Sequence, residues 1–179
     1  SPWLSQHLYE HYRFTADKRY LKETAYPIMK SAAEFCLDWL VEKNGVFVTA
    51  PSTSPKNVYL HPNGFKGTVT VASAMDMEII WDLFTNLIEA SDILGIDKEF
   101  AELLKQKRAK LNPLKIGKKG NLVEWFDDWE DEEPHHRHVS HAFALHPGRQ
   151  ISPLLDTKYS DAVIKTLQIR GDDGTGWSI

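Results

Sequence analysis

The densest group of residues that could do chemistry is a histidine cluster in the last third of the sequence. His138 and His141 would share one face of a helix at a spacing of i and i+3, and neutral imidazole is a common zinc ligand. No further motif with metal-ligand spacing accompanies this pair. A structural cluster, or a substrate site in which Arg and His donors bind hydroxyls or a carboxylate, therefore stays open beside the metal site. The cluster consists of His135, His136, Arg137, His138, His141 and His146.

Glu124 is the carboxylate best suited to acid–base work. It follows Leu122 and Val123 and precedes Trp125, and such apolar surroundings would raise the pKa of a carboxyl group. Aromatic faces beside carboxylates also suit sugars, whose C–H faces stack while their hydroxyls bond to the acids. Six further acids lie between Asp127 and Glu133, and we expect residues 131–133 to form a solvated acidic loop.

Two predicted loops are rich in residue types that often form binding sites. Pro51–Asn57 is a rigid, polar segment, because its prolines fix φ and its hydroxyls can bind backbone or ligand. Arg170–Trp177 is rich in glycine but lacks the strand-to-helix context and the lysine of a phosphate-binding loop. We therefore expect no nucleotide site there.

The elements that must position these residues are predicted to be helical. Apolar residues recur at helical spacing through most of the chain. Asp17 is expected to cap the second helix, with a break or kink at Pro27, and Val46–Thr49 is a short β-prone run. Long loops are expected at 50–67 and 113–136. The predicted helices cover residues 3–14, 17–44, 73–94, 97–111, 139–145 and 156–169, with the third and fourth forming a helical hairpin.

Composition excludes several classes of protein. The 179 residues include 21 Lys plus Arg and 25 Asp plus Glu, and a formal charge of −4 disfavours nucleic-acid binding. No stretch reaches the roughly 18 uninterrupted apolar residues of a membrane span, so no membrane partner is expected. Cys36 is the single cysteine and is expected to be a buried small hydrophobe. The chain reads as a folded, soluble excerpt of a larger protein.

Segments in a fixed order resemble the middle of the catalytic domain of glycoside hydrolase family 95. The best-known activity of this family is inverting α-L-fucosidase, chiefly on α-1,2-linked fucose. Each block alone is a weak signal, but their order and spacing together are specific. The matching segments are Ala50–Pro55, Met75–Ile80 with Asp82–Phe84, Ile116–Lys118 through Glu124–Trp125, His136–His141, Leu145–Gly148, and Arg170–Asp172 with Gly174–Ser178.

The resemblance implies a fold and a set of functional residues. The fold would be all-α, with helical hairpins forming part of an (α/α)6 toroid, and residues 1–179 would be a fragment of a single helical catalytic domain. Arg137 and His138 match residues used around the fucose, so the substrate would be a fucosylated oligosaccharide or glycan. No metal and no cofactor are expected. The Asn-x-Asn pair that assists the water would precede Ser1, and the general-base Asp would follow Ile179.

Lys56 departs from the pattern of the family. The general acid of the family is a Glu directly after the second proline of the Pro-Ser-x-Ser-Pro loop, where this sequence has Lys56. An ammonium group with an ordinary pKa near 10.4 is a poor acid for a glycosidic oxygen. Three hypotheses follow: a fucosidase-like hydrolase, either limited by Lys56 or with its acid moved to a residue such as Glu124; a carbohydrate-binding pseudoenzyme; and, more weakly, a helical scaffold. Arg137 and His138 are expected to face the same concavity as the loop around Lys56.

Overall fold

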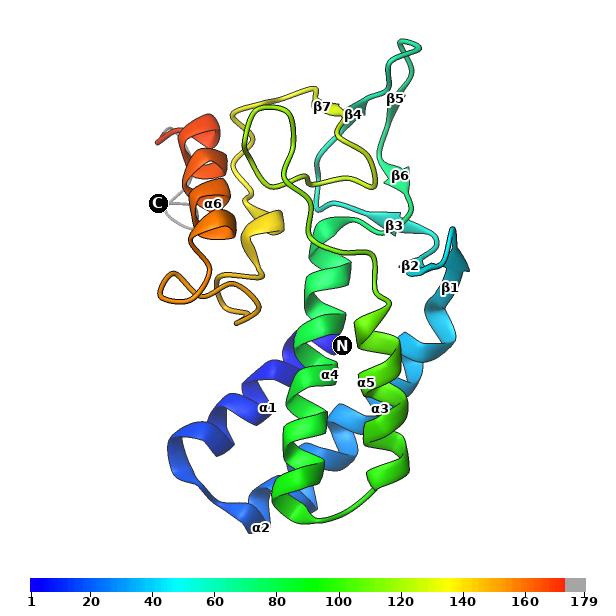
Figure 1. Cartoon of the computed structure of the whole chain (residues 1–179), viewed down its shortest axis with the longest axis vertical. Helices are drawn as coiled ribbons and strands as arrows, with labels where there is room; N and C mark the ends of the chain where they lie inside the picture. The colour runs from blue at the N-terminus through cyan, green and yellow to red at the C-terminus, as the bar shows by residue number, and fades with distance from the viewer. Residues whose placement is uncertain (173–179) are drawn as a thin grey trace. The chain divides into compact units, whose positions relative to one another are not determined.

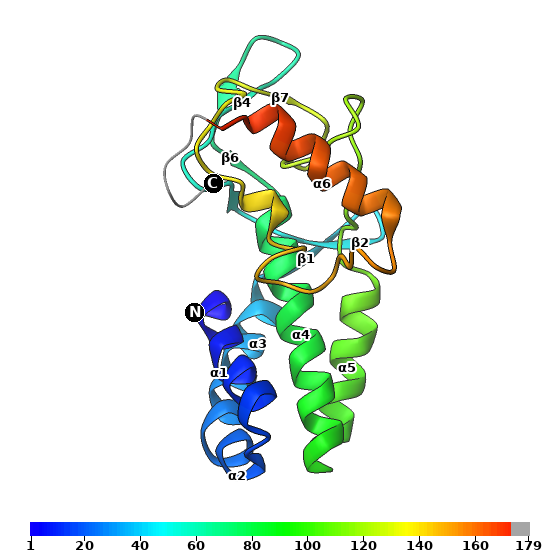
Figure 2. The ribbon, with the colours of Figure 1, turned by 90° about the vertical axis from the view of Figure 1, so that its left-hand side faces the viewer.

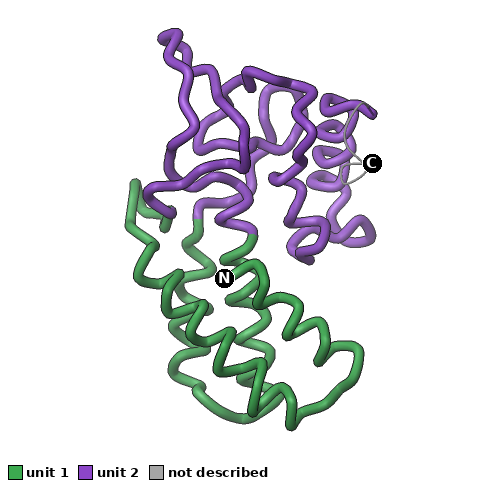
Figure 3. Tube along the Cα trace, turned by 180° about the vertical axis from the view of Figure 1, so that it is seen from behind, with its two compact units in different colours: residues 1–48, 79–111 green, residues 49–78, 112–179 purple. Residues whose placement is uncertain are grey.

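The computed structural model describes residues 1–172, which form two compact units (Figure 3). Among the described residues, the first unit comprises 1–48 and 79–111, and the second comprises 49–78 and 112–172. The sequence block Gly174–Ser178 lies outside the described residues. Each unit is considered by itself below.

The first unit begins with a helical hairpin. Helix α1 spans Pro2–Thr15, and after a turn the Asp17 carboxylate accepts from Tyr20 N at 2.9 Å and caps helix α2, Lys18–Tyr20. A π-helical turn, η1, Leu21–Ala25, leads into α3, Tyr26–Trp39. The predicted cap at Asp17 is confirmed. The expected break near Pro27 takes the form of this change of helix type, because a proline in the first turn of α3 lacks only an N–H that has no helical partner.

The second predicted helix ends earlier than its apolar pattern suggested. It stops at Trp39, and residues 40–43 instead form strand β1, Leu40–Lys43, paired with β2, Val46–Thr49. Asn44 and Gly45 join the strands with φ of 54° and 82°. Positive φ at both central residues is what a two-residue hairpin turn requires, and this local preference outweighs the helical periodicity.

Two helices confirm the predicted hairpin, and residues 79–94 of the first together with all of the second complete the first unit (Figures 1 and 2). Helix α4 spans Ala74–Leu94 and helix α5 spans Lys98–Ala109. The Arg108 guanidinium donates to Thr85 Oγ1 at 2.7 Å and fixes the register of the two helices. Fully buried side chains in this unit are Leu21, Met29, Cys36, Phe84, Leu87 and Leu104.

The second unit contains short antiparallel strands, so the all-α prediction is wrong in this part. Strand β3 pairs with β6, and β4 pairs on its two sides with β5 and β7. Each strand has only two residues, which is too short to produce an alternating pattern in the sequence. Helices still dominate the chain. The strands are β3, Ser52–Thr53; β4, Tyr59–Leu60; β5, Lys66–Gly67; β6, Val69–Thr70; and β7, Glu130–Asp131.

Helix α6, Thr157–Arg170, packs on the segment that carries the histidine cluster (Figure 2). Asp156 caps the helix by accepting from Tyr159 N at 3.2 Å. The predicted helix at 139–145 shrinks to the 3-10 turn η2, Ser140–Ala142. Within residues 1–172, no helix is long and apolar enough to cross a membrane. The small core of this unit contains Leu122, Ala142, Ala144, Ile151, Ala162 and Val163.

Candidate functional site

Glu124 is the centre of a buried polar network in the second unit. Its side chain is 5% exposed, and both of its carboxylate oxygens accept hydrogen bonds. Ser54 Oγ donates to Oε1, and Asn57 Nδ2 donates to Oε2 at 3.0 Å. The Arg170 guanidinium, at the end of α6, lies 2.5 Å from Oε2. One carboxylate therefore joins the 51–57 loop to the last turn of α6.

Arg170 extends this network to three further acceptors. One guanidinium nitrogen lies 2.8 Å from Asp131 Oδ2 and also donates to the carbonyl of Pro134 at 2.8 Å. Nε donates to the carbonyl of His138 at 3.2 Å. The Arg170 side chain is 5% exposed, so its charge is stabilised by these contacts and not by water.

The expectation of a raised pKa at Glu124 is wrong. Burial alone raises the pKa of this carboxyl, but the charges of His141 and Arg170 and the donors Ser54 and Asn57 outweigh it and lower the pKa below the usual value. The apolar neighbours Leu122 and Val123 are adjacent in sequence, whereas the groups that decide the ionisation come from distant segments. A general acid has to hold a proton, and these contacts favour the ionised form of Glu124.

Lys56 lies between the two loop residues that bind Glu124. Ser54 and Asn57 are buried, whereas the Lys56 side chain is exposed. Lys56 has φ of 58°, the left-handed region that non-glycine residues rarely adopt and that often marks functional positions. The hydrogen bonds of Ser54 and Asn57 to Glu124 are two tethers that hold the backbone around this strained residue. The side chain of Lys56 remains in solvent.

The base of the same loop is fixed by a cluster of hydroxyl groups. Ser52 Oγ contacts Ser73 Oγ at 2.9 Å and donates to Asp76 Oδ2 at 2.6 Å, and Thr49 Oγ1 donates to the same oxygen at 3.3 Å. Burial raises the pKa of Asp76, and the hydroxyl donors partly offset that rise. Asp76 belongs to the first turn of α4, so this cluster anchors the loop to the start of a long helix.

The structure brings the Lys56 loop and the histidine segment together. Ser54 Oγ and Ser140 Oγ lie 3.0 Å apart, and each serine is two residues from Lys56 or His138 respectively. Burial lowers the pKa of His138, and the charges of His136, Arg137 and Lys56 lower it further. Arg137 is exposed and has no hydrogen bond or ion pair among residues 1–172.

The histidines divide between buried and accessible positions. His136 is buried, and its Nδ1 accepts from the backbone N–H of His138 at 3.1 Å, as a structural histidine would. His141 is buried with its Nδ1 3.5 Å from Glu124 Oε2, and burial lowers its pKa. Residues 1–172 contain no group of three His, Cys, Asp or Glu side chains arranged to hold a metal ion.

The acidic segment is less solvated than its composition suggested. Asp131 is 19% exposed, because its carboxylate binds Arg170 and accepts from Trp125 Nε1 at 3.0 Å and Asn57 Nδ2 at 3.2 Å. The expectation of a solvated loop is therefore wrong for Asp131. Glu132 does fit it, because this exposed side chain pairs at the surface with Lys66.

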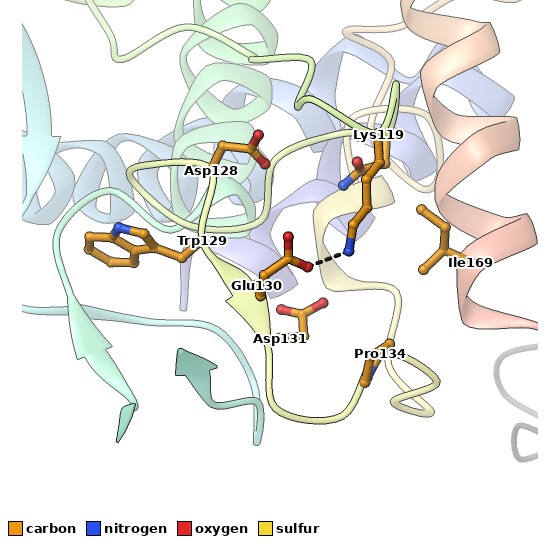
Figure 4. Close-up of a pocket in the computed structure, with 8 residues that line it drawn as sticks. Lys119, Asp128, Trp129, Glu130, Asp131, Pro134 and Ile169 are labelled. Atoms are coloured by element: carbon orange, nitrogen blue, oxygen red, sulfur yellow. Dashed lines mark hydrogen bonds and ion pairs between the residues drawn. The ribbon is translucent and has the colours of Figure 1, made fainter. Parts of the chain in front are cut away.

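A small cavity of about 30 Å³ lies beside this acidic segment (Figure 4). Lys119 reaches across it to Glu130, which also pairs with Lys118 at 2.7 Å. A volume of this size holds about one water molecule, so the cavity does not accept a sugar ring. The nearby Tyr59 and Trp129 rings pack on each other, with centroids 4.5 Å apart. The cavity is lined by Lys119, Asn121, Asp128, Trp129, Glu130, Asp131, Pro134 and Ile169.

Glu78 is a second buried carboxyl that the sequence did not single out. Its Oε2 accepts from Ala144 N at 3.0 Å, and Oε1 has no hydrogen-bond partner among the described residues. Burial raises the pKa of Glu78 well above its usual value, and the nearby charge of Glu124 adds to this rise. The carboxyl is therefore neutral at the pH where ordinary glutamates are ionised.

Because the folded-state pKa of Glu78 is raised, the native state binds its proton more tightly than the unfolded state. The stabilisation is complete below the unfolded pKa and is lost as the pH rises through the folded value. We expect Glu78→Gln to abolish this dependence, so that the variant gains stability relative to wild type as the pH rises above the ordinary glutamate pKa of about 4.3. Thermal unfolding across this range, with exposed Glu34→Gln as the control, measures the difference. A constant difference at every pH would contradict the expectation.

Several network residues were not predicted. Arg170 was assigned to a glycine-rich loop, yet it continues the buried stripe of α6 formed by Ala162, Val163 and Thr166. An arginine that continues the buried face of a helix can be recognised in the sequence, and this position would have predicted a buried ion pair for Arg170. Nothing in the local sequence distinguishes Asp131 from the acids beside it.

The chain is similar to known proteins over its whole length. The sequence profile of the glycosyl hydrolase family 95 catalytic domain matches residues 1–179. Alpha-L-fucosidase 2 of Arabidopsis thaliana is 43% identical over 183 residues, covering 98% of this chain and 21% of the relative. Probable alpha-fucosidase A of Aspergillus niger is 33% identical over 189 residues, covering 98% of this chain and 23% of the relative. The chain thus spans about a fifth of the length of these relatives.

Proposed function

The chain belongs to glycosyl hydrolase family 95, and from this premise we propose that residues 1–179 are part of a single catalytic domain that acts on fucosylated oligosaccharides or glycans. On this proposal the helices belong to an (α/α)6 toroid. The reaction is the inverting hydrolysis of an α-1,2-linked fucoside. Residues outside these 179 supply the base and position the water.

One observation carries the proposal: four of the sequence blocks that resemble the family meet at Glu124, which belongs to one of them and is contacted by Arg170 of another at 2.5 Å. The Ala50–Pro55 block reaches it through Ser54 Oγ, and the His136–His141 block approaches it through Ser140 Oγ at 3.5 Å. A sugar site needs groups from distant segments held rigidly at one place. The network supports such a site on the exposed side of Ser54 and Ser140.

Within this site we assign fucose contacts to Arg137 and His138. An exposed guanidinium and a half-buried, neutral imidazole can bind sugar hydroxyls. Lys56 occupies the position of the general acid. In an inverting hydrolase the acid protonates the leaving oxygen while a base on the opposite face activates water. Glu124, held ionised by Arg170, serves on this assignment as the anchor of the loop.

The second candidate function is a carbohydrate-binding pseudoenzyme of the same fold. The exposed Lys56 favours it, because the loop retains its tethers and its backbone conformation while the acid is missing. Release of fucose from 2'-fucosyllactose by the full-length protein distinguishes the two functions. Hydrolysis establishes the enzyme, and binding without hydrolysis establishes the pseudoenzyme. Absence of both would contradict the proposed sugar site.

Arg137→Ala provides a test of the sugar contacts. We expect binding of L-fucose to weaken by about 10- to 100-fold, because a hydrogen bond to a charged group contributes about 1.5–3 kcal/mol. Stability should change by no more than about 0.5 kcal/mol, since the side chain is exposed. Calorimetric titration and thermal unfolding measure the two quantities. Unchanged binding with a large loss of stability would place Arg137 in the scaffold.

A further inference from the structure

Two cations face solvent where the Lys56 loop meets the histidine segment. Lys56 and Arg137 are exposed, and neither forms an ion pair with any carboxylate in residues 1–172. The Ser54–Ser140 contact of 3.0 Å holds their two segments together. Both charges act on the His138 imidazole and lower its pKa, and cations that share one surface create a positive potential that attracts an anion.

The two buried carboxylates behind the Ser54–Ser140 contact do not neutralise the two cations. Glu124 and Asp131 are turned inward, and both pair with Arg170, at 2.5 Å and 2.8 Å. Exposed Glu133, whose carbonyl accepts from His136 N at 3.0 Å, is a further carboxylate on this segment, so the exposed charges of Lys56, Arg137 and Glu133 sum to +1. With a glutamate at position 56, the same three exposed positions would sum to −1.

Apart from Arg137 and the exposed Glu133 and His135, the other titratable groups of the histidine segment and Glu78 are neutral or buried. Burial and the neighbouring cations lower the pKa of His138, which keeps its imidazole uncharged near pH 7. His136 and His141 are buried, and Glu78 is held in its protonated form by burial. His138 can therefore donate to or accept from a hydroxyl group, while Lys56 and Arg137 supply the charge.

We propose that this site prefers a fucose-like sugar that carries an oxyanion, either a sulfate ester or a carboxylate, over neutral fucose. The proposal rests on the proposed sugar site and narrows its substrate class. A guanidinium binds an oxyanion through two parallel N–H bonds, and an ammonium adds a compact point charge. Lys56 is the determinant of the preference, since the exchange of a carboxylate for an ammonium reverses the charge of the site.

The test compares three sugars by calorimetric titration of the full-length protein. L-fucose is the neutral probe, an L-fucose sulfate carries the ester, and L-galacturonate has the same ring configuration with a carboxylate in place of the methyl group. Both anionic sugars, or one of them, should bind about tenfold or more tightly than L-fucose, which corresponds to about 1.4 kcal/mol. The tighter of the two identifies the oxyanion. The preference should shrink as the salt concentration rises.

Substitutions at position 56 test whether the preference for an anionic sugar depends on the charge of the Lys56 side chain. Lys56→Gln should remove most of the preference and Lys56→Glu should reverse it, whereas Lys105→Glu, the same charge change on an exposed residue of α5, should leave it unchanged. Equal binding of all three sugars to wild type would overturn the inference and leave the proposed function standing. A preference that survives Lys56→Gln, or inorganic sulfate binding as tightly as the anionic sugars, would also overturn it. Failure of every sugar to bind would contradict the proposed function itself.

Discussion

Replacement of Lys56 by glutamate is expected to raise the rate of fucose release from 2'-fucosyllactose by about 10²- to 10⁴-fold, the usual contribution of a general acid. A carboxyl in a partly desolvated loop can hold a proton near neutral pH and pass it to the leaving oxygen. An ammonium in the same place is a weak acid and sets a positive charge beside an oxocarbenium-like transition state. Both effects act in the same direction.

We expect the substitution to leave the surrounding structure intact. Lys56 is exposed and its φ of 58° is equally strained for lysine and glutamate, so the Ser54 and Asn57 tethers should persist. Lys56→Gln is the matched control, because it removes the charge without supplying a proton, and it should give little gain. A wild-type protein as active as ordinary fucosidases, insensitive to Lys56→Glu and inactivated by Glu124→Gln, would show that Glu124 is the acid.

Removal of the Arg170 side chain is expected to cause the largest loss of stability. Arg170→Met leaves the buried carboxylates of Glu124 and Asp131 without their cation, and breaking a buried pair from one side costs about 3–5 kcal/mol. The loop should loosen as well, because Glu124 holds Ser54 and Asn57. Thermal unfolding measures the first effect, and hydrogen exchange of residues 51–57 measures the second.

A matched control and a double variant make this expectation specific. Arg19→Met removes an ion pair with Glu23 whose side chains are 84% and 60% exposed, and it should cost at most about 0.5 kcal/mol. Adding Glu124→Gln to Arg170→Met should restore part of the stability, since one unpaired charge is removed. A loss below about 1 kcal/mol with normal protection of the loop would contradict the role of Arg170 as its anchor.

Most of the helices could be predicted because their signals are local. Residues 73–94 and 97–111 carry apolar stripes several turns long, and the structure places helices at Ala74–Leu94 and Lys98–Ala109. The strands could not be predicted in the same way. Strand β7 pairs with β4, which lies about 70 residues away in the sequence. A strand of two residues is too short to show an alternating pattern of apolar and polar side chains from which the pairing could be predicted.

The site shows the same division between local and distant information. Glu124 could be singled out by its neighbours in sequence, but its pKa is lowered by His141, 17 residues later, by Arg170, 46 residues later, and by Ser54, 70 residues earlier. The adjacent apolar residues therefore gave the wrong direction for its pKa. Lys56 was identified by comparison with a family pattern, and its left-handed backbone and flanking tethers became visible only in three dimensions.

A crystal structure of the full-length protein with bound 2'-fucosyllactose tests the central claim most directly. We predict that the fucose ring contacts Arg137 and His138, with the glycosidic oxygen facing Lys56 Nζ and with Glu124 still buried against Arg170. Such a complex would place an ammonium where the reaction needs an acid. Fucose bound away from the junction of the Lys56 loop and the His138 segment, or with its glycosidic oxygen against Glu124, would contradict this account.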